Sequence, residues 1–208
     1  PKNWPEKKGW GYGMVEIIRG MDNKQKRLAV DAKKFIKRVV VSGVLASPEF
    51  NHRFNKSDYA KFLKHVAQIP TVLDGLYPYV NDPVFRILIN DILSLAKKAP
   101  FQVMDSFLYL AENRNGVVRD ELISFVEEFG GKDHANFYFS LSEQNRMERG
   151  KIAAHMKFTA LMKSRPFLPE CLLPDLFAIK NQISREGVNQ EVRKEIDNFL
   201  LSLREEPA

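Results

Sequence analysis

Two stretches of the chain read VLDGLYPYV (residues 72–80) and VMDSFLYLA (residues 103–111), and their side chains agree in size and polarity at an offset of roughly 31 residues. A turn follows each stretch. Apolar segments that match each other then begin at Val84 and Val117, at an offset of roughly 33 residues, because the second turn is two residues longer. The sequence therefore predicts two consecutive copies of one unit, composed of a helix, a turn and a helix.

The second helix of each unit has a recognisable start. Each start combines residues that favour an N-cap and a turn: Asp82 followed by Pro83 in the first unit, and Asn115 followed by Gly116 in the second. An arginine follows each cap by four residues. Ile89 and Leu122 occupy equivalent inward positions on these helices. In the first unit Pro78 is expected to shorten or kink the first helix, because proline lacks a backbone donor.

This stretch, about residues 70–130, resembles HEAT-type helical repeats in the spacing of Asp82 and Arg86, the apolar pairs behind them and the short turn. The resemblance covers about 60 of the 208 residues and implies an α-solenoid in which each hairpin buries one face on its neighbours. Two amphipathic hairpins in a row also occur in ordinary helical bundles. The fold class that follows is all-α, a helical-hairpin array or α-solenoid-like bundle.

The rest of the chain divides into an arm and a helical body. Residues 1–21 are expected to form an irregular arm rich in glycine and aromatic residues, and residues 22–208 a single all-helical domain with a possible sub-boundary near residues 130–131. The predicted helices outside the two units are a long amphipathic helix capped by Asp22 (23–46), a helix capped by Ser57 (58–68), a helix over 135–141, a helix capped by Ser142 and Glu143 (to 164), a short helix (174–183) and a C-terminal helix that caps the fold (189–204).

Two short segments and three methionines leave alternatives open. The β-branched run Val39–Val41 and the aromatic-rich segment over 135–141 could each form a strand, but neither has a partner strand, so helix is preferred. The methionines Met147, Met156 and Met162 are expected to fill gaps in the core.

Composition limits the class of protein. Hydrophobic residues make up 44% of the chain and charged residues 28%, which is typical of a folded protein and excludes wholesale disorder. The longest uncharged apolar stretch, Val39–Ala46, is far shorter than the roughly 20 residues that span a bilayer. The single cysteine, Cys171, cannot form an intramolecular disulfide, and we therefore expect an intracellular protein, cytoplasmic or nuclear.

Positive charge is concentrated near the N-terminus. Residues 1–65 contain fifteen Lys and Arg against six Asp and Glu, whereas the remainder contains seventeen against twenty. Such a surface is expected to bind phosphates, anionic lipid or an acidic partner. The alternative is that the basic side chains bind no partner and are only solvated. The candidate partner- or phosphate-binding residues lie on the long amphipathic helix: Lys26, Arg27, Lys33, Lys34, Lys37 and Arg38. Trp4, Trp10 and Tyr12 are candidates for stacking on bases, or for pinning the arm to the body.

No constellation for catalysis is apparent. The chain has no phosphate-binding glycine loop with a lysine, no zinc-binding pattern and no nucleophile motif, and its four histidines lie far apart in sequence. We therefore expect that the chain is not an enzyme and that it binds no cofactor, metal or small-molecule substrate. The sequence favours a non-catalytic helical scaffold or adaptor that binds a protein partner within a larger assembly. The alternative is a nucleic-acid-binding protein that contacts the phosphate backbone without reading sequence.

Overall fold

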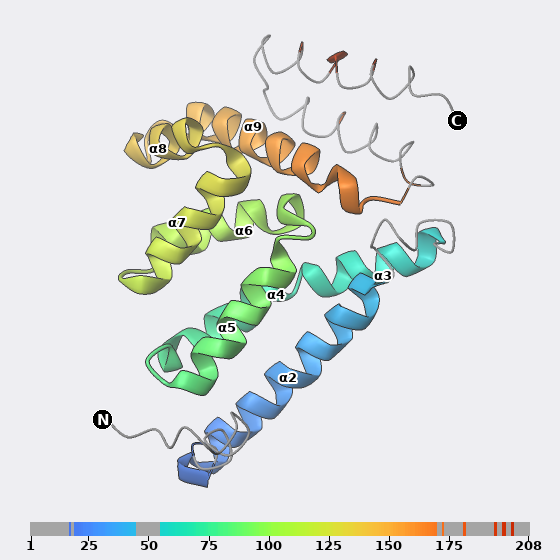
Figure 1. Ribbon diagram of the computed structural model, residues 1–208. Helices are drawn as coiled ribbons and strands as arrows, with labels where there is room; N and C mark the ends of the chain where they lie inside the picture. Colours follow the sequence, from blue (N-terminus) through green and yellow to red (C-terminus); the bar gives the residue numbers. More distant parts are fainter. Residues whose placement is uncertain are drawn as a thin grey trace, which may run out of the picture.

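The computed structural model describes residues 17, 19–44 and 55–169, together with the isolated positions 172, 181, 194, 197, 198 and 201. All the regular elements in these residues are helical, and no strand occurs among them (Figure 1). The helices longer than one turn are α2 (Asn23–Val44), α3 (Lys56–Val66), α4 (Ile69–Leu76), α5 (Pro83–Ala96), α6 (Pro100–Asn113), α7 (Val117–Gly130), α8 (Lys132–Ser140) and α9 (Arg146–Ser164). The short 3-10 helices are η2 (Tyr77–Tyr79) and η3 (Arg165–Phe167). The all-α prediction is confirmed, and both strand alternatives are excluded because those residues lie in α2 and α8.

The start of α2 is fixed by a reciprocal pair of hydrogen bonds. The Asp22 carboxylate accepts from the backbone N–H of Gln25 at 2.8 Å, and the Gln25 side chain accepts from the Asp22 N–H at 3.1 Å. Each bond satisfies a backbone donor that a helix N-terminus leaves free. The predicted cap at Asp22 is therefore confirmed, and α2 packs its buried stripe against α3 and α5.

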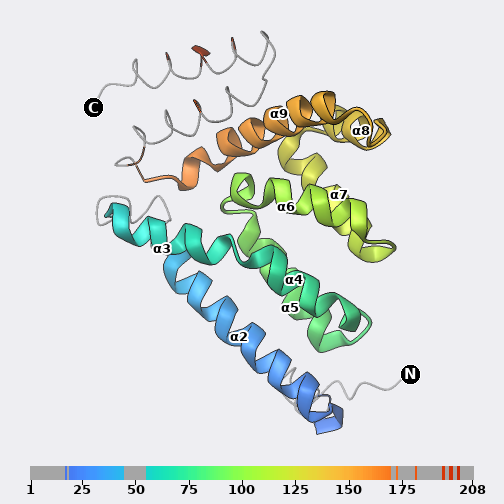
Figure 2. The same cartoon turned by 180° about the vertical axis from the view of Figure 1, so that it is seen from behind.

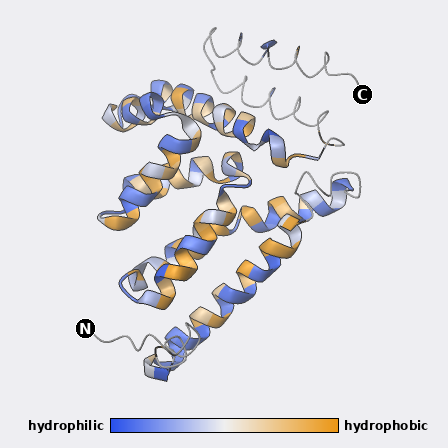
Figure 3. Ribbon diagram, viewed as in Figure 1, coloured by the Kyte–Doolittle hydropathy of each residue, from blue (hydrophilic) through white to orange (hydrophobic). Residues whose placement is uncertain are grey.

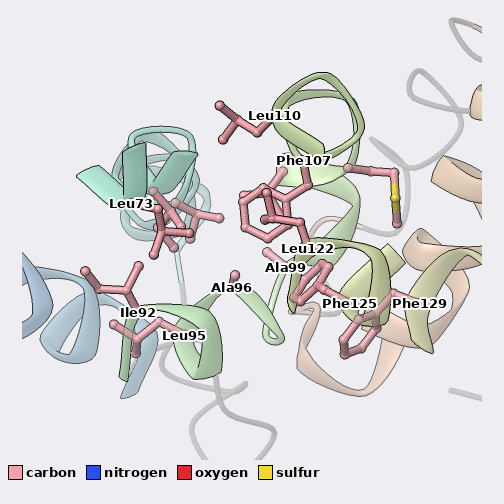
Figure 4. Close-up of a cluster of buried hydrophobic side chains, with 14 of the residues drawn as sticks. Leu73, Ile92, Leu95, Ala96, Ala99, Phe107, Leu110, Leu122, Phe125 and Phe129 are labelled. Carbon is pink, nitrogen blue, oxygen red and sulfur yellow. The ribbon is translucent and has the colours of Figure 1, made fainter. Parts of the chain in front are cut away.

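The two predicted units correspond to α4 with η2 and α5, and to α6 with α7. Pro78 lies in η2, so α4 ends at Leu76 as expected of a helix shortened by proline. Ile89 and Leu122 are both fully buried. Figure 4 shows Leu73 of α4, Phe107 of α6 and Leu122 of α7 in one cluster of buried side chains. One apolar core therefore continues through both units.

The second helices of the two units begin differently. Asp82 caps α5, because its carboxylate accepts from the N–H of Val84 at 2.9 Å. In the second unit the cap is Gly116, which has a φ of 68° and makes no side-chain hydrogen bond. The prediction that Asn115 caps α7 is wrong, because the chain turns into the helix through a positive φ that glycine adopts without strain.

Two further helix starts and two methionines also differ from the predictions. Asn55, and not Ser57, caps α3 by accepting from the N–H of Asp58 at 2.9 Å. The helix predicted to follow Ser142 and Glu143, α9, starts at Arg146. Met147 and Met162 are exposed, so of the three methionines only Met156 belongs to the core. These differences are local and leave the order of helices unchanged.

The predicted sub-boundary at residues 130–131 is a turn between α7 and α8. Gly131 has a φ of 94°, which allows the sharp reversal. A Cβ atom built on Gly130 would lie 2.8 Å from Cβ of Met156, so α7 and α9 approach each other very closely at this point. Helices on both sides of the turn thus share one packed interface.

The helices form an array that runs from α2 at one end to α9 at the other (Figures 1 and 2). The main partners of α5 are α2 and α4, α4 packs on α6, and α6 packs on α7 and α9. Among the described helices, none is long and apolar enough to cross a membrane. Most of the arm over 1–21 lies outside the described residues, and within it Ile17, Arg19 and Gly20 are helical and not irregular as predicted. Most of the predicted helices over 174–183 and 189–204 also lie outside the described residues, but the positions that are described there are helical: Asn181, Lys194, Asp197, Asn198 and Leu201.

Candidate functional site

The candidate cations of α2 lie outside the buried stripe by which the helix packs against α3 and α5. Lys26 is half-buried, and the other five predicted residues are exposed: Arg27, Lys33, Lys34, Lys37 and Arg38. Apart from Asp31, α2 has no carboxylate. We call this exposed side, from Lys26 to Val44, the outer face of α2.

The charge on this outer face is not balanced within the described part of the chain. None of its six candidate cations forms an ion pair there. By contrast, Arg149 and Lys157 of α9 pair with Glu112 and Asp105 of α6. Cations that pack between helices are therefore paired with carboxylates, whereas those on α2 are left to solvent or to a partner.

Valines alternate with the cations on the outer face. Val30 is 49% exposed and Val41 is 58% exposed, and Val40 and Val44 are also exposed. On a helix that turns 100° per residue, Val30 and Val41 lie beside Lys34 and opposite the buried stripe. Figure 3 shows hydrophobic and hydrophilic residues alternating along α2. The helical wheel alone would have revealed these valines, but the sequence reasoning considered only the cations.

A hollow of about 440 Å³ lies where the outer face meets α3. Its lining residues from α2 are Lys34, Lys37, Arg38, Val41 and Ser42, and α3 contributes His65. Nδ1 of His65 is buried and has no hydrogen-bond partner among the described residues. Three of the six predicted site residues are thus gathered at one place, together with a histidine that no sequence pattern associates with them.

A second groove, also of about 440 Å³, separates α5 from α7. Leu93 and Phe125 lie among its lining residues. Arg86 pairs with Glu121 at 3.7 Å, and Lys97 pairs with Glu128 at 2.8 Å, so ion pairs bridge the two helices. Asp120 also lines the groove and forms no ion pair among the described residues, so the lining has two cations and three carboxylates. Unlike the hollow beside α2, this groove therefore has no excess positive charge.

The described residues include no group of three or more His, Cys, Asp or Glu side chains that could hold a metal ion. His134 and His155 do lie together, with their ring centroids 3.9 Å apart, at the interface of α8 and α9.

The chemistry that the outer face of α2 offers is the binding of anions beside apolar groups.

The predicted stacking residues Trp4, Trp10 and Tyr12 lie outside the described residues. Comparison of the chain with protein-family models, with characterised proteins and with solved structures found no match in any of the three.

Proposed function

We propose that the chain is a non-catalytic helical scaffold that binds an acidic segment of a protein partner on the outer face of α2. The observation that supports this function most directly is a row of exposed cations that have no carboxylate partner among the described residues. Complementary charge on a partner would steer association and fix its orientation.

The valines favour a protein over a nucleic acid as the partner. Contacts with a phosphate backbone come mainly from cations and polar donors, and they gain nothing from exposed aliphatic side chains. Protein interfaces bury an apolar centre within a polar rim. Val30 and Val41, flanked by Lys34, Lys37 and Arg38, have this arrangement on a small scale. An amphipathic segment with both carboxylates and apolar side chains therefore fits the face.

One observation favours the alternative, a sequence-independent nucleic-acid binder. Arg27, Lys34 and Arg38 follow one another along a single line of the helix, over about 16 Å at 1.5 Å per residue. Such a line could track a phosphate backbone. Affinity for nucleic acid would then fall steeply with salt, since each neutralised phosphate releases counterions.

The decisive experiment compares three variants for capture of partners from the source cell, with and without nuclease. The first is Arg27→Glu with Lys33→Glu, the second is Val30→Ser, and the matched control is Lys132→Glu with Arg146→Glu on α8 and α9. Lys132 and Arg146 are exposed, so the control reverses the same amount of charge elsewhere on the surface.

Under the proposed function, one protein is captured regardless of nuclease, and both α2 variants lose it while the control retains it. Equal loss in the control would mean that total charge, and not this face, governs capture, and the proposal would fail. The alternative predicts that labelled oligonucleotides bind in fluorescence polarisation at about 50 mM salt and bind more weakly at about 200 mM. Val30→Ser should then leave this binding unchanged, and such a result would establish the alternative.

A further inference from the structure

The hollow beside α2 concentrates hydrogen-bond donors and positive charge in one small area. Lys37 and Arg38 follow Lys34 by three and four residues, and Ser42 follows Arg38 by four, so these side chains are neighbours on the helix surface. His65 closes the area from α3. Three cations, a hydroxyl and an imidazole therefore line about 440 Å³.

Within the described part of the chain, this arrangement is electrostatically unfavourable. Like charges separated by three or four residues on a helix repel each other. Asp31, the single carboxylate of α2, lies three residues before Lys34 and forms no ion pair with it. A bound anion would relieve the repulsion, and this relief would add to the direct attraction.

We propose that this hollow binds a phosphoryl group carried by a side chain of the protein partner. The inference rests on the proposed function of the outer face and specifies the chemical group that anchors the partner. A phosphoryl group carries close to two negative charges at neutral pH and has three strong acceptor oxygens, whereas a carboxylate carries one charge and two oxygens. Lys34, Lys37 and Arg38 together match the larger charge, and the Ser42 hydroxyl and the imidazole supply further donors.

The surroundings of the hollow indicate a peptide and not a free ion. Val41 is one of the lining residues and is 58% exposed, and Val44 lies one turn further along α2 and is 44% exposed. A free phosphate ion makes no use of apolar neighbours. The residues that flank a phosphorylated side chain can bury their apolar groups against these valines and so add affinity.

The test uses the whole chain, labelled with ¹⁵N and ¹³C, and follows its side-chain and backbone signals by NMR during titration. The probes are a short leucine-flanked phosphoserine peptide, the same peptide with serine or glutamate at that position, inorganic phosphate and a single-stranded oligonucleotide. The variants are Lys37→Gln and Arg38→Gln. The control is Lys24→Gln, which removes the same charge from an exposed residue of α2 outside both the hollow and the outer face.

We expect saturable shifts confined to residues 34–44 and His65, with the phosphoserine peptide binding about tenfold or more tightly than its glutamate and serine forms. Each hollow variant should weaken this binding by about tenfold, and Lys24→Gln by much less. Non-saturating shifts at basic residues throughout the chain, or equal affinity for the glutamate peptide, would overturn the inference. Tighter binding of the oligonucleotide or equal binding of inorganic phosphate would overturn the assignment of the source.

The inference and the proposed function can fail separately. If phosphatase treatment leaves partner capture intact while Arg27→Glu with Lys33→Glu abolishes it, the outer face binds a partner but the hollow does not bind a phosphoryl group. If the hollow binds the phosphoserine peptide but the reversal at Arg27 and Lys33 leaves capture unchanged, the site exists and the wider docking face does not.

Discussion

Replacing Lys37 by glutamate should stabilise the folded chain while it destroys the anion site. Lys33 and Lys34 precede Lys37 by four and three residues on α2, so the substitution turns two like-charge pairs into two opposite-charge pairs. Each repulsion lost and each attraction gained is worth about 0.2–0.5 kcal/mol on a helix surface. The free energy of unfolding should therefore rise by about 1–2 kcal/mol at low salt.

Urea denaturation followed by circular dichroism measures this change. The slope against urea should be unchanged, so the gain should appear as a higher midpoint. Lys37→Gln removes the repulsions without adding attractions and should yield about half of the gain. In about 1 M salt the Debye length falls to about 3 Å, and most of the gain should disappear.

A destabilised Lys37→Glu variant, or a gain that persists in high salt, would refute the reasoning. Either result would mean that Lys33 and Lys34 do not repel Lys37 in the free chain, and the proposed phosphoryl-binding hollow would lose its electrostatic basis. The expected combination, higher stability with weaker binding of the phosphoserine peptide, is typical of a residue whose charge serves recognition at the expense of stability.

Three further substitutions test the packing. Gly130→Ala should lower the free energy of unfolding by about 1–3 kcal/mol, because the added Cβ would overlap Met156. The added Cβ of Gly150→Ala in α9 would meet nothing within 4 Å, so this substitution should raise the free energy of unfolding by about 0.5–1 kcal/mol. Equal urea midpoints of the two variants would contradict the close approach of α7 and α9. Ile89→Ala, at a fully buried position, should cost about 2–5 kcal/mol in the same assay. Tyr77→Phe removes a buried hydroxyl that has no partner among the described residues and should stabilise the chain by about 1 kcal/mol. Burial raises the pKa of Tyr77, with smaller contributions from nearby carboxylates, so the stability of the parent should decline above about pH 10, and this decline should be smaller in the variant.

The repeat could be predicted because its signal is local. Leu73 and Met104, separated by 31 residues, are both fully buried, and so are Ile89 and Leu122, separated by 33. A helix that buries one face must place apolar residues at its own period, and that period is visible in the sequence without any knowledge of the neighbours. Pro78 likewise acts on its own helix, and its effect was predictable for the same reason.

The hollow depends on tertiary packing and was not predictable in the same way. His65 lines the same hollow as Lys37 and Arg38 only because α3 packs back onto α2, and the intervening sequence does not indicate the angle between these helices. The wrong prediction that Asn115 caps α7 has a different cause. Asparagine is a common N-cap, but the glycine that follows it allowed a positive φ, and the chain used the glycine. A residue's preference decides the local structure only where its neighbour offers no better alternative.

Ion pairs at equivalent positions of the two units show how the array is built. Asp74 of α4 pairs with Arg114 just beyond α6, and Asp105 of α6, at the matching position, pairs with Lys157 of α9. Each aspartate thus connects its own unit to a part of the chain that comes later in the sequence, the end of α6 in one case and α9 in the other. The stack of α4, α6 and α9 therefore holds together without using the outer face of α2, which lies at the far end of the array from α9 (Figure 1). Since no cation of that face participates in the stack, its charge can be reversed without disturbing the fold, and a loss of binding in such variants can be attributed to the surface itself.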